Sequence, residues 1–435
     1  MPTVTPDSPK AANAADRAYS KVIWRFMPLL FICYVVAYLD RVNVGFAKLN
    51  MLSDLGFNEA AYGFGAGVFF VGYFLFEVPS NLLLHKVGAR RWISRIMVSW
   101  GIVSALTAFV TTPSMFYILR FFLGVAEAGF FPGIILYLTF WFPSHRRAKM
   151  VAFLMAGNPV AGIVGGPLSG YLIYTFAGYG GLHGWQWLFM LEAVPAVLMG
   201  LVVFFFLDDS VAQAKWLLPA DRETVEREIR IDAAGKSLDT IAKMFSSGQT
   251  YLFCLILFGI VMGSYAIGFW LPTIIKNTGI SDVRTVGLLT AIPYLVALVC
   301  MVLTGRSADA RRERRWHVAV PQIVAAAGFV ICGLAGRDNT ALSMFGMVLA
   351  TAGVVTALPM FWALPTAVLG GAGAAAGIAL INSTGNLAGF VSPTILGALN
   401  EYTHNLSSGL FLIAGCLVAS ALLVLVFIPA RVVNR

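Results

Sequence analysis

Four ionisable residues lie inside long apolar stretches of the sequence. Asp40 and Arg41 are neighbours in one stretch, and Arg120 and Glu127 are seven residues apart in another. Seven residues make about two helical turns, so Arg120 and Glu127 point the same way, whereas neighbours diverge by about 100°. An ionisable side chain at the centre of a bilayer costs about 2.5–3.5 kcal/mol. Such residues are therefore expected to pair with one another or to face water.

Carboxyl groups beside arginines can exchange protons and bind anions. An apolar setting favours the protonated form of a carboxyl group, and a nearby arginine favours the ionised form. Arginine itself stays charged and binds a carboxylate through two parallel hydrogen bonds. Because an entering anion changes this balance, the four residues predict a site that couples protons to an anion.

The composition is that of a membrane protein. The chain has 435 residues, of which 59% are hydrophobic and 12% are charged, against about 25% charged in soluble domains. Apolar runs of about 20 residues, enough to cross a bilayer, recur at about 24–42, 60–84, 92–111, 115–142, 148–177, 185–207, 250–275, 284–304, 317–336, 341–364, 371–398 and 407–429. The sequence therefore predicts an all-α membrane protein with twelve transmembrane helices.

One long polar stretch, residues 208–248, divides these spans six and six. This is the pattern of two bundles joined by a linker. We expect an N-terminal six-helix bundle over 21–207, a cytoplasmic linker over 208–248 and a C-terminal six-helix bundle over 249–430. Residues 1–20 are polar and lack an apolar core of signal-peptide length. They are predicted to be a disordered cytoplasmic tail.

Basic residues gather in the loops after the second, fourth and eighth spans, and they predict the orientation. Cytoplasmic loops are enriched in Lys and Arg, so both termini are expected in the cytoplasm of a bacterium, with the protein in its inner membrane. The loop over 369–376 should lie on the same side, although it has no basic residue. The basic loop residues are Lys86, Arg90, Arg91, Arg95, Arg146, Arg147, Lys149, Arg306, Arg311, Arg312, Arg314 and Arg315.

Short patterns recur at matching places in the two halves. Gly157-Asn158 in the fifth span corresponds to Gly385-Asn386 in the eleventh. The loop after the second span contains Gly88-Ala89-Arg90-Arg91, and the loop after the eighth contains Gly305-x-x-x-Asp309-x-Arg311-Arg312. Two correspondences at matching positions indicate duplication of a six-span unit.

These loops resemble the signature of the major facilitator superfamily, Gly-x-x-x-Asp-Arg-x-Gly-Arg-Arg, and the resemblance covers essentially the whole chain. It implies that the two bundles rock around a central site and that the loops gate it. His85 stands where the first copy of the signature would have Asp. Glu77 is a candidate to replace that Asp, although pairing with loop arginines is the simpler interpretation. The gating candidates are Glu77, Arg90, Arg91, Asp309, Arg311 and Arg312.

Within the superfamily, three motifs resemble the anion:cation symporter family. They are Tyr38-Leu39-Asp40-Arg41-Val42-Asn43, Arg120-x-x-Leu123-Gly124-x-x-Glu127-Ala128-Gly129 and Trp141-Phe142-Pro143. The resemblance implies proton-coupled symport of an organic anion by alternating access. Asp40 and Glu127 would carry the protons, and Arg41 and Arg120 would bind the substrate carboxylate or hold the carboxyl groups.

Neutral side chains are candidates for the rest of the substrate site. The candidates are Tyr38, Tyr73, Asn158, Trp362, Asn382 and Asn386, and each could instead serve helix packing. The second half has no charge in the middle of a span, which predicts a substrate whose far end is neutral. We expect a hydroxylated sugar acid or a tartrate-like acid, with an aromatic carboxylate as the alternative.

Other classes of function fit the sequence less well. The pattern Gly162-x-x-x-Gly166-Pro167-x-x-Gly170 is often associated with drug–proton antiporters, although close helix packing explains it equally. No metal-ligand spacing, nucleophile motif or nucleotide loop predicts an enzyme, a cofactor or a metal. The net charge of +9 comes from short loops and does not predict nucleic-acid binding. The expected partners are a small organic anion, protons and the lipid bilayer, and the protein is expected to function as a monomer.

Overall fold

A computed structural model describes residues 9–234, 247–336, 339–368 and 373–434, and these residues contain helices and no strand. The first half comprises α1 (Pro9–Leu55), α2 (Glu59–Val87), α3 (Ala89–Leu106), α4 (Pro113–Glu127), α5 (Phe130–Thr139), α6 (Ser144–Met155), α7 (Gly157–Thr175) and α8 (Gly184–Phe206). After α9 (Pro219–Ala234), the second half comprises α11 (Gly248–Asn277), α12 (Val283–Arg311), α13 (Arg315–Ala335), α14 (Thr340–Val368), α15 (Gly373–Thr403), α16 (Ser407–Phe427) and the short α17 (Ala430–Val433).

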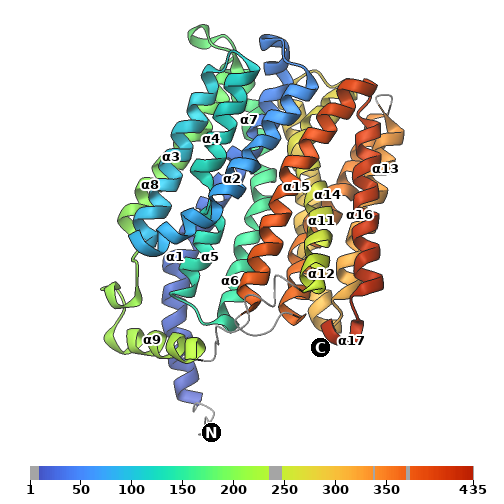
Figure 1. Ribbon diagram of the computed structural model, residues 1–435. Helices are drawn as coiled ribbons and strands as arrows, with labels where there is room; N and C mark the ends of the chain where they lie inside the picture. The colour runs from blue at the N-terminus through green and yellow to red at the C-terminus, as the bar shows by residue number, and fades with distance from the viewer. Residues whose placement is uncertain (1–8, 235–246, 337–338, 369–372, 435) are drawn as a thin grey trace.

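Eleven helical stretches of the described chain are long and apolar enough to cross a membrane. Two of them combine consecutive helices, α4 with α5 and α6 with α7. The twelfth predicted span falls on α15, whose 31 residues are long enough to cross a bilayer. The helices of the first half lie beside those of the second half (Figure 1), so the predicted all-α membrane fold class is confirmed.

The predicted disordered tail is wrong for residues 9–20, which belong to α1. Tyr19 is buried and stacks on Phe142, with 5.8 Å between ring centroids. Asp16 forms an ion pair of 2.8 Å with Arg146. These contacts hold the start of α1 against the turn between α5 and α6 and the first turn of α6, so the helix continues beyond the apolar run that predicted it. Residues 1–8 lie outside the described part of the chain.

The linker packs against the first half. Trp216 stacks on Trp141 with 6.1 Å between centroids, and its indole N–H donates to Asp208 at 2.7 Å. Asp221 at the start of α9 pairs with Lys21 of α1 at 2.6 Å. The remainder of the predicted linker, residues 235–246, and part of the predicted loop 369–376, residues 369–372, lie outside the described chain.

The halves meet along the helix pairs α2 with α15, α7 with α12 and α1 with α11. Small residues allow this approach. A Cβ atom on Gly63 of α2 would lie 2.4 Å from a backbone oxygen of α15, and one on Gly166 of α7 would lie 2.7 Å from a backbone oxygen of α12. The glycine pattern of the fifth span is therefore used for packing between the halves.

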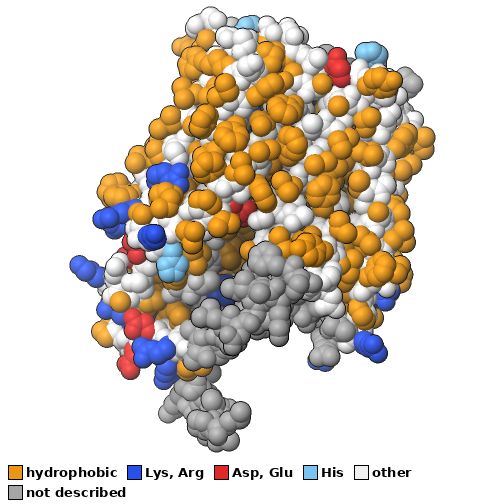
Figure 2. All heavy atoms as spheres, in the orientation of Figure 1, with side chains coloured by type: hydrophobic (Ala, Val, Ile, Leu, Met, Phe, Trp, Pro, Cys, Tyr) orange, Lys and Arg blue, Asp and Glu red, His pale blue; other side chains and the backbone are white. Residues whose placement is uncertain are grey.

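Hydrophobic side chains cover most of the face shown in Figure 2. Lys and Arg side chains gather near the end where both termini lie. This distribution is typical of a multi-pass membrane protein, because uncharged helix surfaces meet the hydrocarbon core.

Candidate functional site

A cavity lies between the two halves. The first half contributes α1, α2, α5 and α6, and the second half contributes α11, α14 and α15. Its lining residues are Tyr34, Ala37, Tyr38, Arg41, Tyr73, Phe130, Phe131, Met155, Leu257, Val261, Ser264, Tyr265, Leu358, Trp362, Asn382, Gly385 and Asn386. Within this described lining, Arg41 is the one charged residue. A charged ligand in the cavity would therefore be an anion.

Arg41 joins the first half to the second. Its guanidinium forms an ion pair with the Glu127 carboxylate and donates to the Tyr265 hydroxyl of α11 at 3.3 Å. The rings of Tyr38, Phe69 and Tyr73 surround it at 5.4–5.5 Å. The side chain keeps 11% of its surface exposed, while that of Glu127 keeps 1%. Arg41 is therefore the member of the pair that the cavity can reach.

Glu127 is placed by a break in the fourth span. It is the last residue of α4, and Gly129 has a left-handed φ of 82° before α5 begins. Glycine adopts this conformation at no steric cost. A Cβ atom at Gly129 would also lie 2.4 Å from the Ser80 hydroxyl of α2. The glycine thus ends the helix where the carboxylate meets α1.

Asp40 points away from the cavity. It is buried, and one carboxylate oxygen accepts from the Ser104 hydroxyl of α3 and from Asn43 Nδ2, the latter at 3.2 Å. Its other oxygen has no hydrogen-bond partner among the described residues. The predicted divergence of Asp40 and Arg41 is observed, with one residue facing α3 and the other facing the cavity.

The sequence did not predict that another buried carboxyl group, that of Glu192, lies close to Asp40. Glu192 of α8 accepts from the Ser169 hydroxyl of α7 at 2.7 Å and lies within electrostatic reach of Asp40. Its second oxygen, like Asn43 Oδ1, lacks a hydrogen-bond partner in the described chain. A buried acidic residue in the sixth span was the available signal, but nothing in the sequence located it relative to Asp40.

Arg120 was predicted either to bind the substrate carboxylate or to hold the carboxyl groups, and it is not among the described residues that line the cavity. It is 1% exposed and donates to the carbonyl oxygens of Gly65 and Ala66 on α2, both at 3.4 Å. Two turns of helix separate it from Glu127, about 10 Å along the axis. In this conformation Arg120 joins α4 to α2.

Asn382 and Asn386 of α15, the predicted substrate contacts, line the cavity, and both also bond Glu77. Asn382 and Asn386 donate to the Glu77 carboxylate at 3.1 and 3.5 Å, and the Ser383 hydroxyl donates to it at 3.4 Å. The interpretation that Glu77 pairs with loop arginines is therefore wrong for this structure. A carboxylate of the first half is bound instead by neutral donors of the second.

The aromatic candidates divide between two neighbouring cavities. Tyr38, Tyr73 and Trp362 line the main cavity. Asn158 lines a smaller one beside it, together with Tyr38, Tyr265 and Tyr294. Tyr265 borders both and was missed, although Gly263-Ser264-Tyr265 interrupts an otherwise apolar span.

The loop residues predicted to gate do not meet across the halves in the described structure. The backbone N–H of Arg90 donates to Asp209 at 2.8 Å, and Asp309 pairs with Arg314 at 2.8 Å. Arg91, Arg311 and Arg312 are exposed. Each loop is thus bonded within its own half.

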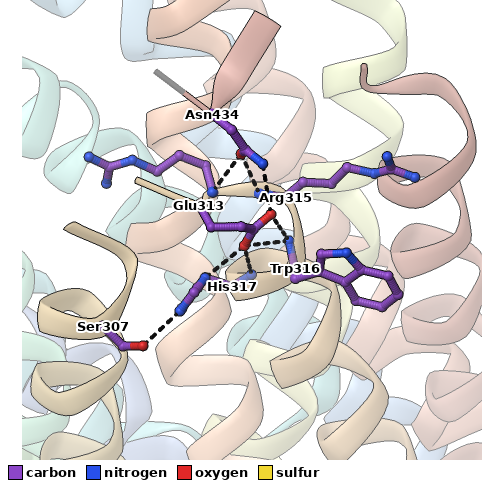
Figure 3. Close-up of polar contacts among 7 residues, drawn as sticks. Ser307, Glu313, Arg315, Trp316, His317 and Asn434 are labelled. Carbon is purple, nitrogen blue, oxygen red and sulfur yellow. Dashed lines mark hydrogen bonds and ion pairs between the residues drawn. The ribbon is translucent and has the colours of Figure 1, made fainter. Parts of the chain in front are cut away.

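Figure 3 shows how the second of these loops is held. Glu313 accepts from the backbone N–H groups of Trp316 and His317, from His317 Nδ1 at 2.7 Å and from Asn434 Nδ2 at 3.1 Å. His317 Nε2 lies 3.0 Å from the Ser307 hydroxyl. Glu313 therefore caps α13 and ties the loop to the end of the chain.

The opposite end of the molecule is closed by contacts between the halves. Lys276 Nζ donates to the Leu49 carbonyl at 2.5 Å, and the Tyr62 hydroxyl donates to the Phe269 carbonyl at 3.0 Å. The Lys48 ammonium lies 3.5 Å from the centre of the Trp270 ring. These contacts join α1 and α2 to α11, away from the termini.

The helix count, the central cavity between two halves and the buried charges define a polytopic membrane transporter. Residues 30–393 match the model of the Major Facilitator Superfamily, and the chain belongs to that family. A structure of the xylose transporter XylE from E. coli, described as a partially occluded inward open conformation, superposes with a TM-score of 0.76 at 16% identity. That match covers 94% of this chain and 99% of the other.

Curated bacterial relatives cover nearly the whole chain. The putative metabolite transport protein NicT of Pseudomonas putida is 48% identical over 96% of this chain and 95% of its own length. A putative tartrate transporter of Agrobacterium vitis is 46% identical over 94% and 91%. A quinolone resistance transporter of Acinetobacter baumannii is 40% identical over 90% and 91%.

Proposed function

We propose that this protein is a proton-coupled symporter that imports an organic anion by alternating access. The observation that carries the proposal is the ion pair between Arg41 and Glu127 at the cavity wall. Arg41 is the charged residue that an anion in the described cavity would meet. Its partner is a carboxyl group that can take up a proton.

The pair provides a direct route to coupling. While Glu127 is ionised, it holds the Arg41 guanidinium, and a substrate carboxylate must compete with it. A proton on Glu127 removes that competitor, and Arg41 can then bind the substrate carboxylate through two hydrogen bonds. Binding of the anion and binding of the proton therefore favour each other.

Asp40 is the second proposed proton site. It lies one residue from Arg41 but faces α3, and one of its oxygens has no donor in the described structure. A buried acceptor without a donor is costly. A proton on the carboxyl group would lower that cost, and it would leave Arg41 free of a second negative charge nearby.

The proposed orientation places both termini in the cytoplasm of a bacterial cell and the protein in the inner membrane as a monomer. The basic residues near the termini support it. A monoanion that enters with two protons carries one net positive charge inward. The membrane potential then contributes about 2.3 kcal/mol per charge per 100 mV.

The proposed substrate is a hydroxylated sugar acid or a tartrate-like acid. Its carboxylate would bind Arg41, and its hydroxyl groups would face Asn382, Asn386 and Ser264 on the opposite wall. The relative named as a putative tartrate transporter supports this choice. The aromatic rings in the lining favour an aromatic carboxylate as the second candidate, because rings stack on rings.

Efflux of a drug in exchange for protons is a further candidate, supported by the relative named as a quinolone resistance transporter. Transport assays with purified protein in liposomes distinguish anion symport from drug–proton antiport. We expect labelled gluconate or tartrate to accumulate under an inward proton gradient and a protonophore to abolish accumulation. Proton-driven transport of a quinolone, with no uptake of either acid or of benzoate, would favour the antiporter.

A further inference from the structure

Glu77 lies where the two halves meet, and the second half supplies all three of its hydrogen-bond donors. They are Asn382 Nδ2 at 3.1 Å, the Ser383 hydroxyl at 3.4 Å and Asn386 Nδ2 at 3.5 Å. Glu77 is 5% exposed. An ionised carboxylate only accepts hydrogen bonds, so these three neutral groups of α15 act as donors to the oxygen atoms of an anion.

Two of these donors belong to the cavity. Asn382 and Asn386 line it, whereas Ser383 and Glu77 are not among its lining residues. Arg41 lines the same cavity from the first half. A substrate carboxylate bound to Arg41 would therefore leave the neutral oxygen atoms of the substrate to the two amides. Those amides are already engaged by Glu77.

We propose that Glu77 is an internal competitor of the substrate. In the empty transporter its carboxylate occupies donors of α15 that the substrate hydroxyl groups use, and substrate binding displaces it. The inference rests on the proposed function, because it assigns the hydroxylated end of the anion to these amides. It adds that filling the cavity breaks a bond between α2 and α15. Substrate binding is thereby transmitted to the contact between the halves.

If Glu77 and the substrate compete for the same donors, substitutions at residues in contact with one another should change the affinity for gluconate in opposite directions. Glu77→Gln weakens the competitor, because the amide nitrogen of Gln cannot accept a hydrogen bond. Ser383→Ala weakens it too and changes no residue of the cavity lining. Both should bind gluconate about threefold more tightly or better, since the fraction of protein competent to bind rises. Asn382→Ala removes a donor that substrate and Glu77 share, so it should bind gluconate more weakly.

A second acid supplies the matched control. Hexanoate has the carboxylate of gluconate but no hydroxyl groups, so it should not need the α15 amides. We expect Glu77→Gln to tighten binding of gluconate but not of hexanoate, as measured by calorimetry on purified protein. If Glu77→Gln and Asn382→Ala weaken gluconate binding alike, Glu77 is only a structural tie and the proposal is wrong.

A distance measurement tests, without any ligand, whether the hydrogen bonds from Asn382, Ser383 and Asn386 to Glu77 hold the two halves together. Spin labels at Lys86→Cys of α2 and Ala310→Cys of α12, both exposed positions, report the separation of the halves in a background without native cysteines. Ligand-free Glu77→Gln and Ser383→Ala should show the distances that gluconate induces in the parent protein. Unchanged distances in both variants would overturn the proposal. If the distances shift while the parent binds no gluconate, the proposed substrate class is wrong and the tie stands.

Discussion

The Tyr265 hydroxyl of α11 accepts a hydrogen bond from Arg41 of α1 at 3.3 Å. The candidate substrate-binding arginine of the first half therefore contacts the second half directly. Tyr265 also borders both cavities. The proposed anion site is thus lined by both halves, as the proposed alternating access requires of a central site.

Tyr265→Phe should raise the KM for uptake about tenfold or more and leave the fold intact. It removes one hydrogen bond to a charged group, worth about 1.5–3 kcal/mol, while the ring keeps its stacking on Phe269. The measurement is concentration-dependent uptake in liposomes. Tyr294→Phe is the matched control, because Tyr294 lines the smaller cavity and has no hydrogen bond to Arg41 in the described structure. An equal rise in KM in that variant would show that the Tyr265 hydroxyl has no special role.

Glu127→Gln should separate exchange from accumulation. The variant cannot ionise at this position, so exchange of labelled for unlabelled substrate should continue while proton-driven accumulation disappears. Both are measured in liposomes, with and without a pH gradient. Accumulation that survives the substitution would show that Glu127 does not carry the coupled proton.

Arg41→Lys should weaken substrate binding, whereas Arg120→Lys should lower thermal stability. Arg41 lines the cavity, so lysine there should weaken substrate binding about tenfold or more, because a bidentate partner is lost. Arg120 donates to two backbone carbonyls of α2, so lysine there should lower thermal stability and leave the affinity of the folded fraction nearly unchanged. Calorimetry and thermal unfolding distinguish the two. If Arg120→Lys is stable but binds the substrate much more weakly, Arg120 contributes to substrate binding.

Glu313 should make the loop between α12 and α13 sensitive to acid. Burial raises the pKa of this carboxyl, but the N–H groups of Trp316 and the side chains of His317 and Asn434 outweigh it, so the pKa is lowered. Because the folded pKa is below the unfolded one, the stabilisation is present above about pH 4.3 and is lost as the pH falls through the folded value.

Glu313→Gln tests this directly. It should cost about 1 kcal/mol at pH 7, the usual value of a helix cap. It should also flatten the dependence of thermal unfolding on pH below about 4.3, relative to the parent. Unfolding curves that shift with pH identically in both proteins would show that Glu313 does not titrate with folding.

The sequence predicted the elements and the unusual charges well because both depend on local composition. Apolar runs located the spans, and helical spacing predicted the divergence of Asp40 and Arg41. The hydrogen-bond partners of these charged residues could not be predicted, because the contacts form between spans that are far apart in the chain. Glu77 was expected to meet loop arginines and meets α15 instead, and Arg120 was expected in the cavity but bonds the backbone of α2. The start of α1 was missed because Asp16 and Tyr19 contact Arg146 of α6 and Phe142 before it, and no apolar run marks this part of the helix.

The central claim is that a proton on Glu127 frees Arg41 for the anion. Calorimetry of gluconate binding in buffers with different ionisation enthalpies measures how many protons the protein takes up when it binds. We predict net proton uptake by the parent protein and an uptake lower by about one proton in Glu127→Gln. Binding without proton uptake, or the same uptake in both proteins, would contradict the account.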